Sequence, residues 1–271
     1  MHYTEFPADG PLKPYVQCYF TCETDAEVVT GDRVYASGFV ELMFNLGEHG
    51  PQELTAAGLV RQPLVQLWGQ TIRPFTFTSV GKHRMLGVRF FAHTAACFFD
   101  EPIQRFNDQV IDFNEMAGAS GRLLHERLQE APSLTHQIAL VEEFLLARLA
   151  RLQPKHPRQQ LVSRLVQEMN QPGFLEHINA IAVRYGISSR YLQKLFLASS
   201  GLSPGLYRKI LRFQKSLRLV TQGVESLTAI AYACQYYDQS HFIKDFKAFI
   251  GVAPSYFITE SSTELQAVLK K

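Results

Sequence analysis

An internal repeat in the carboxyl-terminal half constrains the fold more than any other feature of this 271-residue sequence. Ile178–Ala182 matches Leu227–Ala231 at an offset of 49 residues. Further along, the matches continue at an offset of 50, where Leu192, Lys194, Phe196, Gly201 and Pro204 correspond to Phe242, Lys244, Phe246, Gly251 and Pro254. One extra residue therefore falls between the two blocks of the second copy, where a turn can absorb it.

Each copy predicts a short helix, a tight turn and a second helix. Gly186 can end the first helix with a positive φ. Ser188 and Asp238 are good N-caps for the second helices. Gly201 and Gly251 stand where those helices stop, and Ser203-Pro204 is typical of a new helix start. Two helices joined by such a turn form a helix-turn-helix unit, so the repeat predicts two of them.

The charge is distributed unevenly along the chain. Residues 1–157 hold 13 Lys and Arg against 18 Asp and Glu, a net charge of −5, whereas residues 158–271 hold 14 against 7, a net charge of +7. A basic half joined to an acidic half favours a polyanion as the partner of the basic half. The expected partner is double-stranded DNA.

The amino-terminal half favours strands. Short runs rich in aromatic and β-branched residues are separated by Gly, Pro and Asp; they are Tyr15–Cys22, Phe39–Leu46, Leu54–Val60, Ile72–Val80 and Met85–Phe91. Short strands without intervening helices predict an antiparallel β-barrel or jelly roll, cupin-like in outline. Two helices should follow, over Glu115–Gln129 and Ser133–Leu152. The apolar stripe of the second packs either on its own barrel or on a second copy, which makes 133–152 the candidate homodimer contact.

The expected fold class is therefore α+β with two domains. We expect a β-barrel domain with helices over residues 1–153, which would sense a ligand or mediate dimerisation. A proline-containing linker over 154–160 and an all-α domain over 161–260 follow, in which two helix-turn-helix units are joined by a linker helix; 261–271 form a tail. The 4 cysteines do not form a disulfide framework, and no segment has the features of a signal peptide or a membrane-spanning helix. We expect a cytoplasmic protein that makes no contact with a membrane.

The segment Ile178–Phe257 resembles the DNA-binding region of the AraC/XylS family of transcription regulators. The match lies in Ala231 to Lys247, Gly251, Pro254 and Tyr256, and in Ile181-Ala182, Gly186-Ile187-Ser188, Leu192, Phe196, Gly201 and Pro204 of the first unit. The resemblance implies a sequence-specific regulator, for example an activator, that works with RNA polymerase. Gln235 stands where the family usually has Gly, so we expect a different turn in the second unit.

A recognition helix presents the exposed residues of its amino-terminal part to base edges in the major groove. The expected base-contacting residues are Ser189, Arg190, Gln193 and Lys194 in the first unit, and Gln239, Ser240, Ile243 and Lys244 in the second. Arg190 suits guanine, Gln193 and Gln239 suit adenine, and Ile243 suits a thymine methyl group. The alternative is that these side chains only solvate an outer face.

A helix over Gly205–Val220 should join the two units and hold the recognition helices side by side, because about 15 helical residues span roughly 22 Å. Cations beside it should contact phosphates. The expected phosphate-contacting residues are Arg208, Lys209, Arg212, Lys215, His241 and Lys247.

The acidic half carries no convincing catalytic or metal-binding pattern, so we expect no enzyme activity, no cofactor and no metal. Glu41, Arg84 and Arg89 are the candidates for contacting a small-molecule effector, although surface ion pairs are an equally simple role for them. Two other readings stay open. One is a cupin-type enzyme fused to a DNA-binding domain, dependent on His49, His83 or His93. The other is an adaptor whose helical repeat binds a protein.

Overall fold

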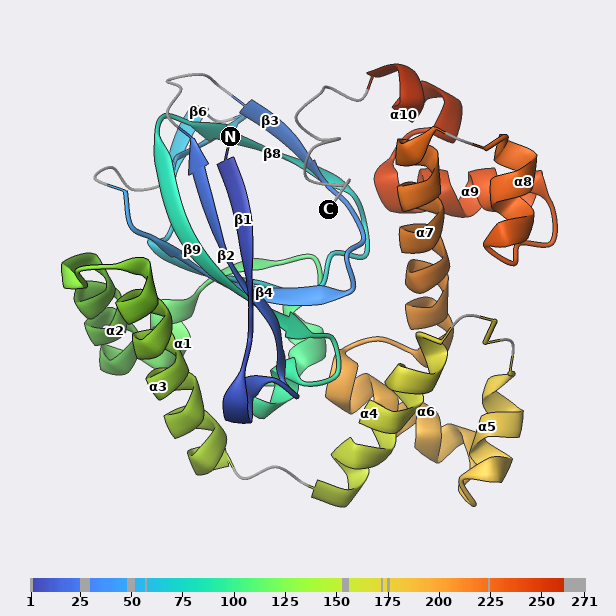
Figure 1. Ribbon diagram of the computed structural model, residues 1–271, viewed down its shortest axis with the longest axis horizontal. Helices are drawn as coiled ribbons and strands as arrows, with labels where there is room; N and C mark the ends of the chain where they lie inside the picture. Colours follow the sequence, from blue (N-terminus) through green and yellow to red (C-terminus); the bar gives the residue numbers. More distant parts are fainter. Residues whose placement is uncertain are drawn as a thin grey trace.

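The computed structural model describes residues 2–24, 30–47, 52–56, 58–152, 156–171, 173–174, 176–223 and 225–260, so His49 and the tail 261–271 lie outside the described residues (Figure 1). Its strands are β1 (His2–Pro7), β2 (Val16–Thr24), β3 (Thr30–Val34), β4 (Phe39–Asn45), β5 (Gln52–Thr55), β6 (Gly58–Arg61), β7 (Val65–Trp68), β8 (Phe75–Val80), β9 (His83–Phe91) and β10 (Val110–Asp112). Its α-helices are α1 (Phe113–Ala117), α2 (Ala119–Glu130), α3 (Leu134–Leu152), α4 (His156–Met169), α5 (Ile178–Arg184), α6 (Ser189–Ser200), α7 (Pro204–Gln222), α8 (Leu227–Ala233), α9 (Gln239–Ile250) and α10 (Pro254–Glu260). Short 3-10 helices lie at η1 (Gly10–Leu12), η2 (Ala95–Cys97) and η3 (Ile103–Phe106).

The strands form two antiparallel sheets. One has the order β1-β2-β9-β4-β7-β10 and the other the order β3-β8-β5-β6. This confirms the expected fold class, an antiparallel β domain followed by an all-α domain, with two sheets instead of one closed ring. The run predicted as one strand over Leu54–Val60 is a hairpin of β5 and β6, because Gly58 turns the chain with a φ of 107°.

The six-stranded sheet carries buried apolar side chains on both faces. Alternate residues of a strand point to opposite faces. Val40, Leu42 and Phe44 of β4 face the helices and join the larger core of this domain, whereas Met43 packs with Cys18 and Phe20 on the other face. The second face is where Glu41 and Arg89 also lie, because they alternate with the core residues.

Helices α1 to α3 cover the first face of this sheet. Gly118, with a φ of 60°, divides the helix predicted over Glu115–Gln129 into α1 and α2. In α3, Val141 and Leu145 are fully buried in the core of their own domain, with Ile138 and Leu149 packed against it. The apolar stripe of α3 therefore packs on its own sheet, the first of the two alternatives.

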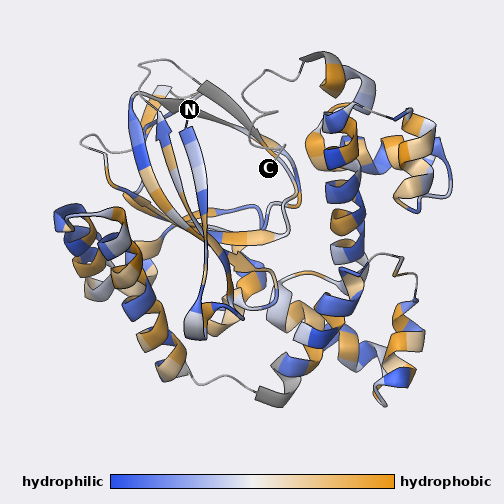
Figure 2. Cartoon of the chain, viewed as in Figure 1, coloured by the Kyte–Doolittle hydropathy of each residue, from blue (hydrophilic) through white to orange (hydrophobic). Residues whose placement is uncertain are grey.

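Helices α4 to α10 share a second core, which includes Phe196, Phe213 and Phe246. Helix α7, with 19 residues, is the long element that joins the two helical units, and Figure 2 shows hydrophobic and hydrophilic stretches alternating along it. Helix α4 begins at His156, inside the range predicted as a linker, and Pro157 is compatible with the first turn of a helix. The domain boundaries themselves stay a prediction.

Candidate nucleic-acid interface

The first helix of each unit ends in the same way, with a different residue at the left-handed position. In the first, Gly186 has a φ of 66°, and the amide of Ile187 donates to the Ala182 carbonyl over 3.0 Å. In the second, Gln235 has a φ of 61°, and the amide of Tyr236 donates to the Ala231 carbonyl over 2.9 Å. This is the hydrogen-bond pattern of a helix that ends in a left-handed residue. At Gln235 itself the expectation of a different turn was wrong, because Gln235 adopts the left-handed conformation that glycine would adopt more easily. The second turn differs only in being one residue longer before the next N-cap.

The predicted caps start the second helix of each unit. Ser188 Oγ accepts from the Tyr191 amide over 3.2 Å, and Asp238 Oδ1 accepts from the His241 amide over 2.7 Å. Gly201 and Gly251 end α6 and α9 in the left-handed conformation. The repeat therefore predicted both helix-turn-helix units from local chemistry alone.

Both second helices direct their carboxyl ends at the β domain. At the end of α6, Asn107 Nδ2 donates to the Gly201 carbonyl over 2.8 Å, and Gln70 donates to the Ser200 carbonyl. At the end of α9, the Ala36 amide donates to the Phe249 carbonyl over 3.3 Å. Since each helix has 12 residues and a length of about 18 Å, both amino-terminal ends lie well away from the β domain (Figure 1).

Most of the residues predicted to read bases are exposed at those free ends. Arg190, Gln193, Lys194, Ser240 and Lys244 are exposed. Ser189 and Gln239 are half-buried and tie the two helices of their unit together: Ser189 Oγ donates to Asn179 Oδ1, and Thr228 Oγ1 donates to Gln239 Oε1, each over 2.8 Å. Ile243 packs partly against the core.

The predicted phosphate-contacting residues differ in how much they are engaged inside the protein. Lys209 and Lys247 are exposed. Lys215 Nζ donates to the Ala233 carbonyl over 2.6 Å and remains exposed. Arg212 is the most engaged, because its guanidinium contacts Asp245 Oδ2 over 3.2 Å, donates to the Gln235 carbonyl over 3.4 Å and lies 4.6 Å from the centre of the Tyr236 ring.

Asp245 lies close to the side chains of Arg212, Lys209 and His241. Besides Arg212, Lys209 Nζ lies 4.0 Å from Oδ1 and His241 Nε2 lies 3.8 Å from Oδ2. The Asp245 carboxylate is buried, and Leu195 stands at the equivalent place in the first unit. The second unit therefore has a buried carboxylate with basic partners where the first unit has an apolar side chain, and sequence reasoning missed it because the partners are 4 to 36 residues apart.

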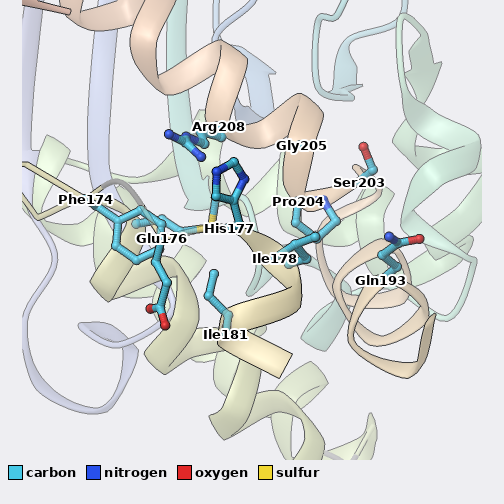
Figure 3. A pocket seen from close by; sticks show the side chains of 11 residues that line it. Phe174, Glu176, His177, Ile178, Ile181, Gln193, Ser203, Pro204, Gly205 and Arg208 are labelled. Carbon is cyan, nitrogen blue, oxygen red and sulfur yellow. The ribbon is translucent and has the colours of Figure 1, made fainter. Parts of the chain in front are cut away.

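A pocket of about 410 Å³ lies in the first unit between α4, α5, α6 and α7. Figure 3 shows Arg208, His177 and Gln193 around it, so one predicted phosphate contact and one predicted base contact line the same hollow. Burial beside Arg212 lowers the pKa of Arg208 below its usual value. The remaining lining includes apolar side chains such as Ile178 and Ile181.

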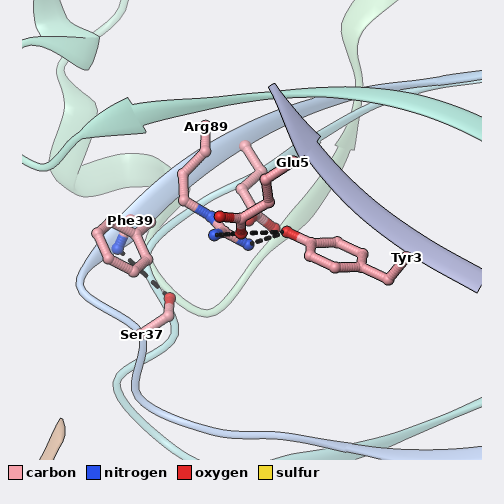
Figure 4. Close-up of polar contacts among 6 residues, drawn as sticks. Tyr3, Glu5, Ser37, Phe39 and Arg89 are labelled. Atoms are coloured by element: carbon pink, nitrogen blue, oxygen red, sulfur yellow. Dashed lines mark hydrogen bonds and ion pairs between the residues drawn. The ribbon is translucent and has the colours of Figure 1, made fainter. Parts of the chain in front are cut away.

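In the β domain the structure brings together two of the three candidate ligand residues. Arg89 Nε donates to Glu41 Oε1 over 2.6 Å. Figure 4 shows Arg89 beside Glu5, and Arg89 NH1 donates to Glu5 Oε1 over 2.8 Å. The Arg89 guanidinium also lies beside two aromatic rings, 5.3 Å from the Phe20 ring centre and 5.2 Å from that of Phe39. Arg84 is exposed elsewhere on β9. Glu5 was missed because β1 was not predicted as a strand.

The histidines of the enzyme reading are not gathered into a site in the described part of the chain. His83 is half-buried at the start of β9, and His93 is buried just after its end. Burial lowers the pKa of His93 to about 4. Among the described residues, no group of three or more His, Cys, Asp and Glu side chains is placed to hold a metal ion, and no helix is long and apolar enough to cross a membrane.

Comparisons with known proteins separate the chain into the same two parts. Residues 181–260 match a family described as "Helix-turn-helix domain", and residues 4–112 match a family described as "Domain of unknown function (DUF6597)". A relative named HTH-type transcriptional activator RhaS, from Escherichia coli, is 28% identical over 120 residues, which is 43% of each chain. The protein of the same name from Escherichia fergusonii is 35% identical over 75 residues, 28% of this chain and 27% of the relative. The matches thus span less than half of these relatives.

Two solved structures are similar in outline. ToxT from Vibrio cholerae is 13% identical, and the superposition covers 89% of this chain and 98% of that one with a TM-score of 0.48. A protein described as a probable AraC family transcriptional regulator, from Rhodopseudomonas palustris, is 27% identical and covers 37% of this chain and 95% of its own, with a TM-score of 0.34.

Proposed function

We propose that this chain is a sequence-specific DNA-binding regulator of transcription of the AraC/XylS type, because residues 181–260 match a helix-turn-helix family and the repeat resembles the DNA-binding region of those regulators. The observation that carries the proposal is the shared orientation of α6 and α9. Their carboxyl ends contact the β domain, and their amino-terminal ends with Arg190 and Ser240 are free. Two recognition helices held this way suit successive major grooves on one side of a duplex.

The roles of the side chains follow from their exposure. Arg190, Gln193 and Lys194 read bases through α6, and Ser240 and Lys244 do so through α9, while Ser189, Gln239 and Ile243 add contacts from the half-buried edge. Arg208, Lys209, Lys215, His241 and Lys247 contact phosphates, so binding weakens as salt rises. Arg212 is proposed to act mainly inside the protein, where it holds the turn of the second unit.

The test begins with selection of duplexes from a random library by the full chain. The proposal expects one enriched sequence with two half-sites about one helical turn apart, bound with an affinity that falls steeply with salt. Lys215→Ala should weaken selected and unrelated duplexes alike, because a phosphate contact carries no sequence information. Enrichment of no duplex, or binding that is insensitive to salt, would contradict the proposal.

The β domain is proposed to regulate this binding. Its loops contact both helix-turn-helix units, at Asn107 with Gly201 and at Ala36 with Phe249, and Gln214 of α7 donates to the Ala36 carbonyl. A small-molecule effector that altered the β domain would therefore change the support of both recognition helices. Glu41 and Arg89 are the candidate effector contacts, and an anionic effector would compete with Glu41 and Glu5 for Arg89.

Effector binding can be tested by screening small carboxylates and sugars for a shift in the melting temperature of the full chain, followed by DNA titration. Arg89→Gln should abolish a shift caused by a carboxylate, and Arg61→Gln, at an exposed arginine of β6, is the matched control. If no compound alters either measurement, the β domain has only a structural role.

RNA polymerase is the proposed partner for activation. A homodimer through 133–152 would have to use the exposed side of α3, near Leu146, since the apolar stripe of α3 is buried.

A further inference from the structure

The extra residue of the second repeat is Tyr237. Gly186 and Gln235 correspond because both are left-handed. The next residues, Ile187 and Tyr236, correspond because their amides make equivalent hydrogen bonds. In the first unit the N-cap Ser188 follows at once. In the second, Tyr237 stands between Tyr236 and the N-cap Asp238.

Tyr237 projects into solvent from a firmly held turn. Its side chain is 87% exposed, the highest value among the exposed large hydrophobic side chains of the described residues. On one side, Tyr236 is buried under the Arg212 guanidinium. On the other, Asp238 caps α9 through the His241 amide. Because its two neighbours are held in place, the backbone of Tyr237 is fixed and its side chain extends into solvent from a defined position.

The place of Tyr237 is next to the amino-terminal end of α9, the end that is turned away from the β domain. In a helix-turn-helix complex this end enters the major groove, so the residue just before the N-cap lies at the edge of the groove, beside the sugar–phosphate backbone. Tyrosine is one of the side chains that donate hydrogen bonds to phosphate oxygens, and its ring offers apolar surface to a sugar.

We propose that Tyr237 is a DNA-contacting residue of the second unit, whose hydroxyl donates a hydrogen bond to a phosphate and whose ring packs on the adjoining sugar. This inference rests on the proposed function. The two units then differ in one respect. The second unit contacts the DNA backbone through an uncharged side chain, whereas the first unit has no residue at this place. The contact adds affinity without adding to the salt dependence, since a neutral side chain releases no counterion.

The experiment uses the full chain and the duplex selected by the unaltered protein. Tyr237→Phe removes only the hydroxyl and should weaken binding about threefold to tenfold, the effect of one net hydrogen bond. Tyr237→Ala should weaken binding further, while the slope of affinity against salt stays that of the unaltered protein. Lys247→Ala, by contrast, removes a proposed phosphate contact from α9 and should lower that slope by about one. Leu59→Ala, which trims an exposed apolar side chain on β6, is the matched control and should leave DNA binding unchanged.

Phosphate ethylation interference locates the contact. One phosphate beside the half-site of the second unit should be essential for the unaltered protein and dispensable for Tyr237→Phe. Equal affinity of the unaltered protein, Tyr237→Phe and Tyr237→Ala for the selected duplex would overturn the inference, and a loss of transcription with unchanged DNA binding would assign Tyr237 to a protein partner instead. Failure to select any duplex would contradict the proposed function, so the two failures are distinguishable.

Discussion

At the scale of single residues, the structure distinguishes an arginine that remains exposed from one whose guanidinium is engaged inside the fold. Arg190 is exposed near the free end of α6, whereas Arg212 contacts Asp245, the Gln235 carbonyl and the Tyr236 ring. Both are arginines on the basic half of the chain. Their sequence surroundings did not separate them, because the partners of Arg212 come from α9 and from the turn before it.

Replacing Arg190 by Ala should relax base preference at one position of the selected site and cost roughly 1–3 kcal/mol of binding free energy, the value of one bidentate guanine contact. Titration of the matched duplex and of duplexes with each base at that position measures this. An unchanged affinity and an unchanged preference would remove Arg190 from the set of base-reading residues.

Replacing Arg212 by Ala should destabilise the fold, because it leaves the buried Asp245 carboxylate with only Lys209 and His241 near it. Removal of one partner of a buried ion pair costs about 3 kcal/mol. Urea unfolding of the full chain gives the free energy of unfolding, and Lys215→Ala, which removes an exposed cation from the same helix, is the control with little effect on it. Similar stabilities for the two variants would show that Arg212 is a surface cation after all.

At the scale of elements, the two turns perform the same task with unequal strain. A left-handed conformation costs a residue with a side chain roughly 1 kcal/mol, and glycine escapes that cost. The first turn has Gly186 and the second has Gln235, at nearly the same φ. In the second unit Arg212 offsets the conformational cost at Gln235, because its guanidinium donates a hydrogen bond to the Gln235 carbonyl.

A reciprocal pair of substitutions tests this balance. Gln235→Gly should raise the free energy of unfolding by about 0.5 kcal/mol, since relief of strain is partly offset by the greater freedom of glycine in the unfolded chain. Gly186→Gln should lower it by about 1 kcal/mol, and an added Cβ at Gly186 meets nothing within 4 Å, so this loss is conformational. If denaturant titrations showed that both substitutions change the free energy of unfolding in the same direction, the difference in strain between the two turns would be refuted.

At the scale of the whole molecule, the β domain contacts the helical domain around α6 through both hydrogen bonds and apolar packing. Ala92 belongs to the core shared with the helical domain, and η2 and η3 contact α6. His93, 5% exposed, lies between β9 and η2 in this region. A buried neutral histidine at this place links the stability of the molecule to pH.

Stability should fall as the solution becomes acidic. Burial lowers the pKa of His93 to about 4 from its ordinary value near 6.5, so between these values the unfolded chain binds a proton that the folded chain does not. The His93 contribution is full above pH 6.5 and decreases by about 1.4 kcal/mol per pH unit towards pH 4. Urea unfolding at pH 7.5, 6 and 5 measures it, and His93→Gln should flatten the difference. Parallel pH profiles of the two proteins would mean that His93 does not carry the effect.

The amino-acid sequence by itself determined the repeat, both capped second helices and the class of each half, because glycine, proline and capping residues act within a few residues of where they stand. The tertiary structure decided which charges remain free and how the recognition helices are aimed. Arg89 finds Glu5 only through the pairing of β1, β2 and β9, and α6 and α9 share a direction only because Asn107 and Ala36 receive their carboxyl ends. These contacts join residues distant in the chain, and no local pattern encodes such distances.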